Sequence, residues 1–209
     1  MAPRAVISDF GGVLTNPLIE AFAAYQERSG IDTGDLGQAL QASSERLGVH
    51  PLFALERGEI SEAEFRRRAE AELADGARLE GFREIYFEHL EPNRAMIDYM
   101  ADLRGRGLRM ALLTNNVREW EPLWRAKLPE LDDVFEVVVD SAFVGMRKPD
   151  PAIYELTLER LGGGLSGPDC VFVDDLEPNC ETARALGMTA VVFRDADQAI
   201  AEVEAALNK

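Results

Sequence analysis

Short apolar runs alternate with longer amphipathic segments along most of the chain. The runs at 4–8, 108–114, 134–140, 171–175 and 190–193 contain many β-branched residues, which is typical of buried strands. Between them, apolar residues recur at helical spacing and predict helices at 94–106, 149–161, 177–186 and 197–207. Strands that alternate with helices predict an α/β fold, a doubly wound parallel sheet with helices on both faces.

One long stretch, residues 17–92, breaks this alternation. It contains no convincing strand and carries Ala, Glu, Arg, Leu and Phe at helical spacing. Ser61 followed by Glu64 predicts a capping box at the start of one of its helices. We therefore expect an α/β core formed by residues 1–16 and 93–209, interrupted after its first strand by a helical insertion at 17–92.

A second helical region is expected around Trp120 and Trp124. The two residues are four positions apart, so they should share one helix face, where core packing or a subunit contact is the expected role. The sequence therefore leaves open whether the protein forms a homodimer.

Acidic residues outnumber basic ones, 38 to 22, which gives a formal net charge of −16. Such a charge repels nucleic acid and anionic membranes, so neither is an expected partner. No apolar run approaches the ~20 residues that cross a bilayer, and the segment before Asp9 is too short for a signal peptide. These features predict a cytoplasmic protein in which Cys170 and Cys180 are reduced, half-buried thiols.

Polar residues with chemical potential follow the predicted strands. They are Asp9, the pair Thr114-Asn115, Lys148, and the pair Asp174-Asp175. Each is ordinary alone, because Asp, Asn and Lys-Pro are common in turns and helix caps. Ligands of open parallel sheets bind at the carboxyl ends of the strands. Four such groups at successive strand ends therefore indicate one shared site.

In order and spacing this set resembles the four motifs of the haloacid dehalogenase-like hydrolases. The matching segments are Val6 to Leu14 around Asp9, Ala111 to Asn115, Gly145 to Asp150 around Lys148, and Val171 to Asp175 followed by Asn179. The resemblance covers nearly the whole chain. It places the insertion at 17–92 where this family carries a helical cap, and we call residues 17–92 the cap.

The resemblance implies a role for each motif residue. Asp9 would be the nucleophile, and Mg²⁺ would be held by Asp9, Asp174, Asp175 and the Gly11 carbonyl. Phosphate would be bound by Thr114, Asn115 and Lys148, with Gly11 and Gly12 shaping the turn beside it. Asn179 is expected to orient Lys148 or a ligand. The implied activity is Mg²⁺-dependent hydrolysis of a small phosphorylated metabolite, with a sugar phosphate as one candidate.

Gly11 departs from the family pattern. Phosphatases of the family that this chain resembles usually carry a second aspartate two residues after the nucleophile, and this aspartate acts as general acid and base. Glycine occupies that position here, and glycine cannot transfer a proton. Some sugar-phosphate phosphatases of the family resemble this chain in having glycine there, and share stretches like Arg57 to Ser61 and Gly145 to Pro149. A substrate with a good leaving group, a water or a cap residue would compensate for the missing acid.

Two alternatives stay open. A 2-haloacid dehalogenase needs no leaving-group acid, but it needs no metal either. Without a cation, the carboxylates of Asp174 and Asp175 would repel each other, which counts against this alternative. A binding or regulatory protein with a weakened site is the second alternative. A phosphonate-cleaving variant would need a cap lysine, and residues 17–92 contain none.

Several other side chains have two interpretations. His50 and His89, in or beside the cap, are expected to serve packing, although either could touch substrate. Arg118 and Arg147 could add positive charge to the site or form surface ion pairs.

Overall fold

The computed structural model describes residues 2–208 and contains a five-stranded parallel sheet. The strands are β1 (Ala5–Ser8), β2 (Arg109–Thr114), β3 (Val137–Asp140), β4 (Cys170–Asp174) and β5 (Thr189–Val192). Their order is β3-β2-β1-β4-β5, which places the first strand at the centre of the sheet. Ala5 lies opposite both Arg109 and Cys170. The predicted fold class is confirmed.

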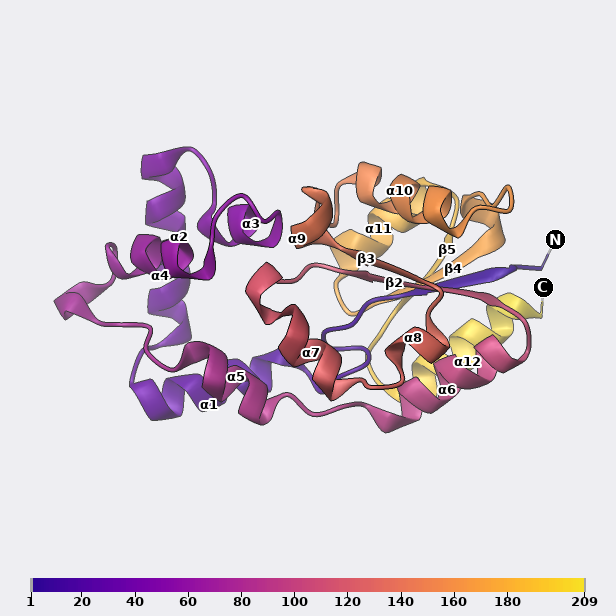
Figure 1. Cartoon of the computed structure of the whole chain (residues 1–209), viewed down its shortest axis with the longest axis horizontal. Coiled ribbons are helices and arrows are strands. Elements are labelled where there is room, and N and C mark those ends of the chain that lie inside the picture. The colour runs from indigo at the N-terminus through magenta and orange to yellow at the C-terminus, as the bar shows by residue number, and fades with distance from the viewer. Residues whose placement is uncertain (1, 209) are drawn as a thin grey trace.

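Helices cover both faces of the sheet (Figure 1). On one face lie α10 (Pro151–Leu161) and α11 (Glu177–Ala185), and on the other lie α6 (Arg94–Gly105) and α12 (Ala196–Leu207). Side chains alternate along each strand, so Val6 enters the apolar cluster under α6 and α12, whereas Ile7 enters the cluster under α10 and α11. Burial on both faces explains why the strands read as continuous apolar runs.

Short helical segments correct two expectations in the region 115–145. It contains η2 (Arg118–Trp120), α7 (Glu121–Lys127), α8 (Leu131–Val134) and α9 (Ser141–Val144). The strand expected from residue 134 begins at 137, because 131–134 close a helical turn first. Trp120 and Trp124 lie in different elements, η2 and α7, rather than on one helix face. Trp124 packs on Phe10, with ring centroids 5.2 Å apart.

The cap is built of helices. They are α1 (Leu18–Ser29), α2 (Thr33–Leu47), α3 (Pro51–Glu56), α4 (Glu62–Glu70), η1 (Ala74–Gly76) and α5 (Phe82–His89). The two chain segments that join cap and core run side by side, because Thr15 forms an antiparallel bridge with Pro92 and the Asn16 N–H donates to the Glu91 carbonyl at 2.8 Å.

Only half of the expected capping box forms at α4. The Ser61 hydroxyl accepts a hydrogen bond from the Glu64 N–H at 3.2 Å. The Glu64 carboxylate binds Arg67 and Arg68 instead of returning to the Ser61 backbone. Two cations on the next helical turn outcompete one backbone N–H for a carboxylate.

Cys170 and Cys180 are free thiols in the apolar cluster beneath α10 and α11, and both are fully buried rather than half-buried. Between residues 2 and 208, no helix is both long enough and apolar enough to span a membrane.

Candidate functional site

The sheet order brings three of the motifs together at one edge. Asp9 directly follows β1, while Thr114 and Asp174 end the flanking strands β2 and β4. Ser8 lies level with Leu112 and Val173, so Asp9 emerges beside Asp174, and Thr114 lies one residue farther along β2. This is the carboxyl edge of a parallel sheet, where ligands bind in open α/β folds.

Lys148 brings the third motif to this edge. Its Nζ lies 2.7 Å from Asp9 Oδ1 and 2.6 Å from Asp174 Oδ2, and its side chain is only 1% exposed. Burial opposes the ammonium charge, but Asp174 and Asp9 prevail and raise the pKa of Lys148 above its usual value. Lys148 is therefore a fixed positive charge beside the Asp9 carboxylate.

Two asparagines hold the groups around Lys148. The side-chain oxygen of Asn115 accepts from the Lys148 backbone N–H at 2.8 Å, and its amide donates to the Lys148 carbonyl at 3.0 Å. Asn179 donates to Asp174 Oδ1 at 2.9 Å. Asn179 thus contacts the carboxylate that holds Lys148, not Lys148 itself. The sequence position of Asn115 indicated phosphate binding but gave no sign of this clamp.

Three carboxylates converge on the same point. Asp9, Asp174 and Asp175 each offer an oxygen, and these oxygens lie within 4.8 Å of one another. Burial and the charges of Asp174 and Asp175 raise the pKa of Asp9 to about 7, although Lys148 acts in the opposite direction. Burial and Asp174 raise the pKa of Asp175 to about 6. One ammonium does not neutralise three carboxylates, and clustered hard oxygens suit Mg²⁺, so this donor set fits the ion.

Gly12 has a structural task in the turn, and its expected place beside the phosphate stays a prediction. Its N–H donates to Thr15 Oγ1 at 3.0 Å, so this N–H is already satisfied within the turn. Its φ of 78° lies in the left-handed region, and a Cβ there would lie 2.9 Å from Asp175 Cγ and collide with Oδ2. Glycine at position 12 therefore makes room for Asp175.

Gly11 is packed against the cap. A Cβ at this position would lie 3.1 Å from Leu18 Cδ1, at the start of α1. The space that the family's second aspartate would enter is thus occupied by an apolar cap side chain. Position 11 therefore lacks an acid, and an apolar side chain lies where that acid would be.

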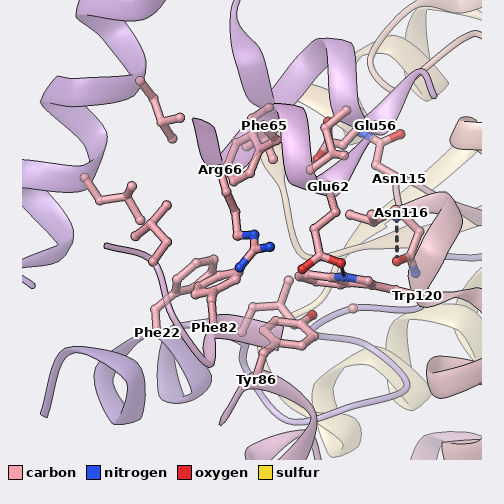
Figure 2. A pocket seen from close by; sticks show the side chains of 18 of the residues that line it. Phe22, Glu56, Glu62, Phe65, Arg66, Phe82, Tyr86, Asn115, Asn116 and Trp120 are labelled. Atoms are coloured by element: carbon pink, nitrogen blue, oxygen red, sulfur yellow. Dashed lines mark hydrogen bonds between the residues drawn. The ribbon is translucent and has the colours of Figure 1, made fainter. Parts of the chain in front are cut away.

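A cavity of about 360 Å³ lies between this edge and the cap (Figure 2). At the core end it is lined by Gly11, Thr114 and Asn115, and farther in by residues of α1 to α5. Arg66, Phe82 and Tyr86, which the sequence reasoning missed, line its walls. The i, i+4 spacing of Phe82 and Tyr86 was the available signal, and it does not distinguish a cavity wall from core.

Arg147 connects the core to the cap side of this cavity, whereas Arg118 binds another segment of the core. Arg147 Nε donates to Glu56 Oε2 of α3 at 2.6 Å, and its guanidinium lies 4.0 Å from the centre of the Phe53 ring. Burial raises the pKa of Glu56 despite this partner. Arg118 Nε donates to the Ala142 carbonyl at 3.1 Å. Both guanidinium groups thus form hydrogen bonds within the protein.

The two histidines make packing contacts. His50 stacks on the Phe53 ring, with centroids 4.5 Å apart. His89 Nδ1 lies 3.0 Å from the Ile85 carbonyl, one helical turn earlier.

The chain is similar to proteins of established families. A family model described as haloacid dehalogenase-like hydrolase matches residues 3–187. The bifunctional epoxide hydrolase 2 of Sus scrofa is 30% identical over 219 residues, which cover 98% of this chain but 39% of that protein. The chain thus spans about two fifths of that relative. A phosphatase of Mycobacterium tuberculosis is 30% identical, covering 91% of this chain and 87% of that protein.

A solved structure with the same fold is a HAD family enzyme of Bacteroides thetaiotaomicron in complex with magnesium and inorganic phosphate. It superposes with a TM-score of 0.67 at 23% identity and covers 92% of this chain and 94% of that one. The four motifs occupy the matched range, and their side chains meet at one edge of the sheet. The chain belongs to the haloacid dehalogenase-like hydrolases.

Proposed function

We propose that this hydrolase is a Mg²⁺-dependent phosphomonoesterase that acts on a small phosphorylated metabolite through an aspartyl-phosphate intermediate. One observation carries the proposal: the Asp9 carboxylate lies against Lys148 Nζ and within 4.8 Å of carboxylate oxygens of Asp174 and Asp175. A carboxylate nucleophile needs a nearby cation to approach a phosphate dianion. A dehalogenase would gain nothing from the acidic pair.

Each residue has a proposed task in the reaction. Asp9 attacks phosphorus, the bond to the leaving oxygen breaks, and that oxygen departs with the electron pair. Water then attacks phosphorus, which releases inorganic phosphate and regenerates Asp9. Lys148 orients Asp9 and, with Thr114 and Asn115, binds the phosphate oxygens. Mg²⁺, held by Asp9, Asp174, Asp175 and the Gly11 carbonyl, would neutralise charge on the phosphate.

The cap is proposed to exclude water and to select the substrate. The proposed limits 17 and 92 are supported by the bridge between Thr15 and Pro92, which lies beside them. Cap residues line most of the cavity that opens onto Thr114 and Asn115. Closure of such an element over a phosphate site protects the intermediate from side reactions.

Phosphate release from a panel of phosphorylated sugars, nucleotides and acyl phosphates tests the proposal, with Mg²⁺ and with a chelator. We expect Mg²⁺-dependent turnover that disappears in Asp9→Asn, while circular dichroism and thermal unfolding show a folded variant. Full activity of Asp9→Asn would refute the nucleophile. Silence across the panel, followed by halide release from 2-haloacids, would establish the dehalogenase alternative; silence in both assays would favour a binding protein.

A further inference from the structure

The cavity beneath the cap is continuous with the proposed phosphate site. Its volume of about 360 Å³ lies within the ~300–1,000 Å³ range typical of small-molecule sites. Gly11, Thr114 and Asn115 form one end, so a phosphate bound there would place the rest of its molecule among the cap helices. The walls of this cavity therefore indicate what the leaving group is made of.

Those walls are largely apolar. Leucines of α2 and α3 form one side, and aromatic rings of α1, α5 and η2 form the other. Tyr86 packs on Trp120 with ring centroids 5.0 Å apart, and Phe82 lies 6.0 Å from the same indole (Figure 2). Burying sugar hydroxyls against hydrocarbon without hydrogen-bond partners is unfavourable. The cavity favours an apolar body over a sugar.

The two carboxylates on these walls are already engaged. Glu62 Oε2 accepts from Trp120 Nε1 at 3.0 Å and from Arg83 Nη1 at 3.2 Å. Glu56 is paired with Arg147. Neither is free to bind the several hydroxyls of a sugar.

The leaving oxygen meets no acid at position 11. Gly11 carries no side chain, and Leu18 fills the space beside it. A phosphate whose leaving group is weakly basic needs no proton at this step. Phenolates and carboxylates are such leaving groups, whereas alkoxides are not.

Resting on the function proposed above, we propose that the substrate joins an apolar body to phosphate through a weakly basic oxygen, as aryl phosphates and long-chain acyl phosphates do. Its phosphate lies at Asp9 and its body fills the cap cavity. The phenolate or carboxylate departs with the electrons of the cleaved P–O bond.

Arg66 is the proposed specificity residue of this cavity. It projects from α4 toward Phe22 and Phe82 (Figure 2), and it lines the cavity. A hydrogen bond from a charged donor is strong in a largely apolar cavity, so the Arg66 guanidinium would bind an acceptor on the substrate. A carbonyl or carboxylate oxygen on the apolar body is such an acceptor.

The first test compares kcat/KM for acetyl, hexanoyl and lauroyl phosphate, 2-naphthyl phosphate, and glucose 1-phosphate. We expect each added methylene to raise kcat/KM about fourfold, the factor that matches ~0.8 kcal/mol, until the cavity is full. The naphthyl ester should likewise exceed glucose 1-phosphate by at least tenfold. Equal or better use of acetyl phosphate or glucose 1-phosphate would overturn the inference while leaving the phosphatase proposal intact. Hydrolysis of none of them would count against the phosphatase proposal itself.

A cavity-filling variant tests whether the apolar body of the substrate lies in the cap cavity. Gly37 lies in α2 on the same helix face as Thr33, Leu36 and Leu40, and all four line the cavity. A Cβ at Gly37 would meet nothing within 4 Å, so the first carbon of the new side chain in Gly37→Leu enters open space. We expect KM for lauroyl phosphate to rise at least tenfold with acetyl phosphate unaffected. The matched control is Gln38→Leu, on the exposed side of α2. Equal effects of both variants on the two substrates would refute the placement.

Arg66→Met tests the specificity residue, with Arg67→Met as the matched control. Arg67 is the next residue of α4, and its side chain is 74% exposed. With 6-carboxy-2-naphthyl phosphate, Arg66→Met should raise KM at least tenfold more than it does with 2-naphthyl phosphate, and Arg67→Met should leave both values unchanged. A uniform loss on both substrates would show that Arg66 is structural.

Discussion

At the scale of single residues, the site depends on glycines and carboxylates whose tasks differ from their appearance in sequence. Gly12 belongs to a motif that indicates phosphate contact, yet its place is required by Asp175. Asp140 reads as the polar end of a strand, yet it is 6% exposed and one of its oxygens lacks a partner among the described residues. The close approach of Gly12 and Asp175 should affect metal affinity, and the burial of Asp140 should affect the free energy of unfolding.

Gly12→Ala should weaken Mg²⁺ binding. The alanine Cβ would displace Asp175, and a residue with φ near 78° is strained in addition. We expect the Mg²⁺ concentration for half-maximal activity to rise at least tenfold. The control is Gly48→Ala, where φ is 74° and a Cβ would meet nothing within 4 Å, so it carries the strain alone. An unchanged Mg²⁺ requirement in Gly12→Ala would remove Asp175 from the metal site.

Asp140→Asn should stabilise the protein at neutral pH. Burial raises the pKa of Asp140 from 3.8 to about 6, so the folded state binds a proton more tightly than the unfolded state. Stability therefore falls as pH rises from about 4 to about 6 and stays lowered above that range. Asparagine keeps the side-chain oxygen at the start of α9 that accepts a hydrogen bond from the Ala142 N–H at 2.9 Å. We expect a gain on the order of 2 kcal/mol near pH 7, measured by urea unfolding.

The gain from Asp140→Asn should vanish near pH 4, where the wild-type carboxyl is protonated in both states. Asp133→Asn, at an exposed position of α8, serves as the control and should change the unfolding free energy by less than about 0.5 kcal/mol. A gain independent of pH would contradict the titration of Asp140.

At the scale of elements, the strands and core helices could be predicted because their apolar periodicity is strong. The strand at 170–174 and the helix at 151–161 match their predicted positions within about two residues. In 118–144 the start of the strand and the division of the helical region were not predicted, because these elements are short and have too few residues to show a period. The ion pair between Glu56 of α3 and Arg147 was also invisible, since 91 positions separate its members.

The Glu56–Arg147 pair should behave as a cap–core contact. Their side chains are only 15% and 19% exposed. Arg147→Met would leave Glu56 buried without its partner, which should cost on the order of 2 kcal/mol of unfolding free energy. Adding Glu56→Gln should recover part of this loss. A double-mutant cycle by urea unfolding measures the coupling, and strictly additive effects would show that the pair is not coupled.

At the scale of the whole molecule, topology explains why it was predictable that the motif residues lie close together. Asp9, Thr114 and Asp174 are far apart in sequence, but parallel strands end at one edge, so their strand-end positions already implied that they meet. The cavity was not predictable, because its walls depend on how the cap helices pack over the core. Phe82 and Tyr86 are spaced like any buried helix residues, and only the assembled cap makes them walls.

The net charge of −16 should make substrate capture depend on salt. With the proposed Mg²⁺ bound, the charges of three carboxylates, one ammonium and the ion would cancel at the site, so the acidic body of the protein would set the long-range field. That field repels a phosphate dianion at low ionic strength, and salt screens the repulsion. We expect KM for a phosphate substrate to fall at least twofold between ~0.01 M and ~0.15 M sodium chloride at constant free Mg²⁺. Reversing one exposed charge far from the site, as in Glu202→Lys, should weaken this dependence slightly without changing kcat. A KM that rises with salt would show that positive charge near the cavity dominates the approach of the substrate.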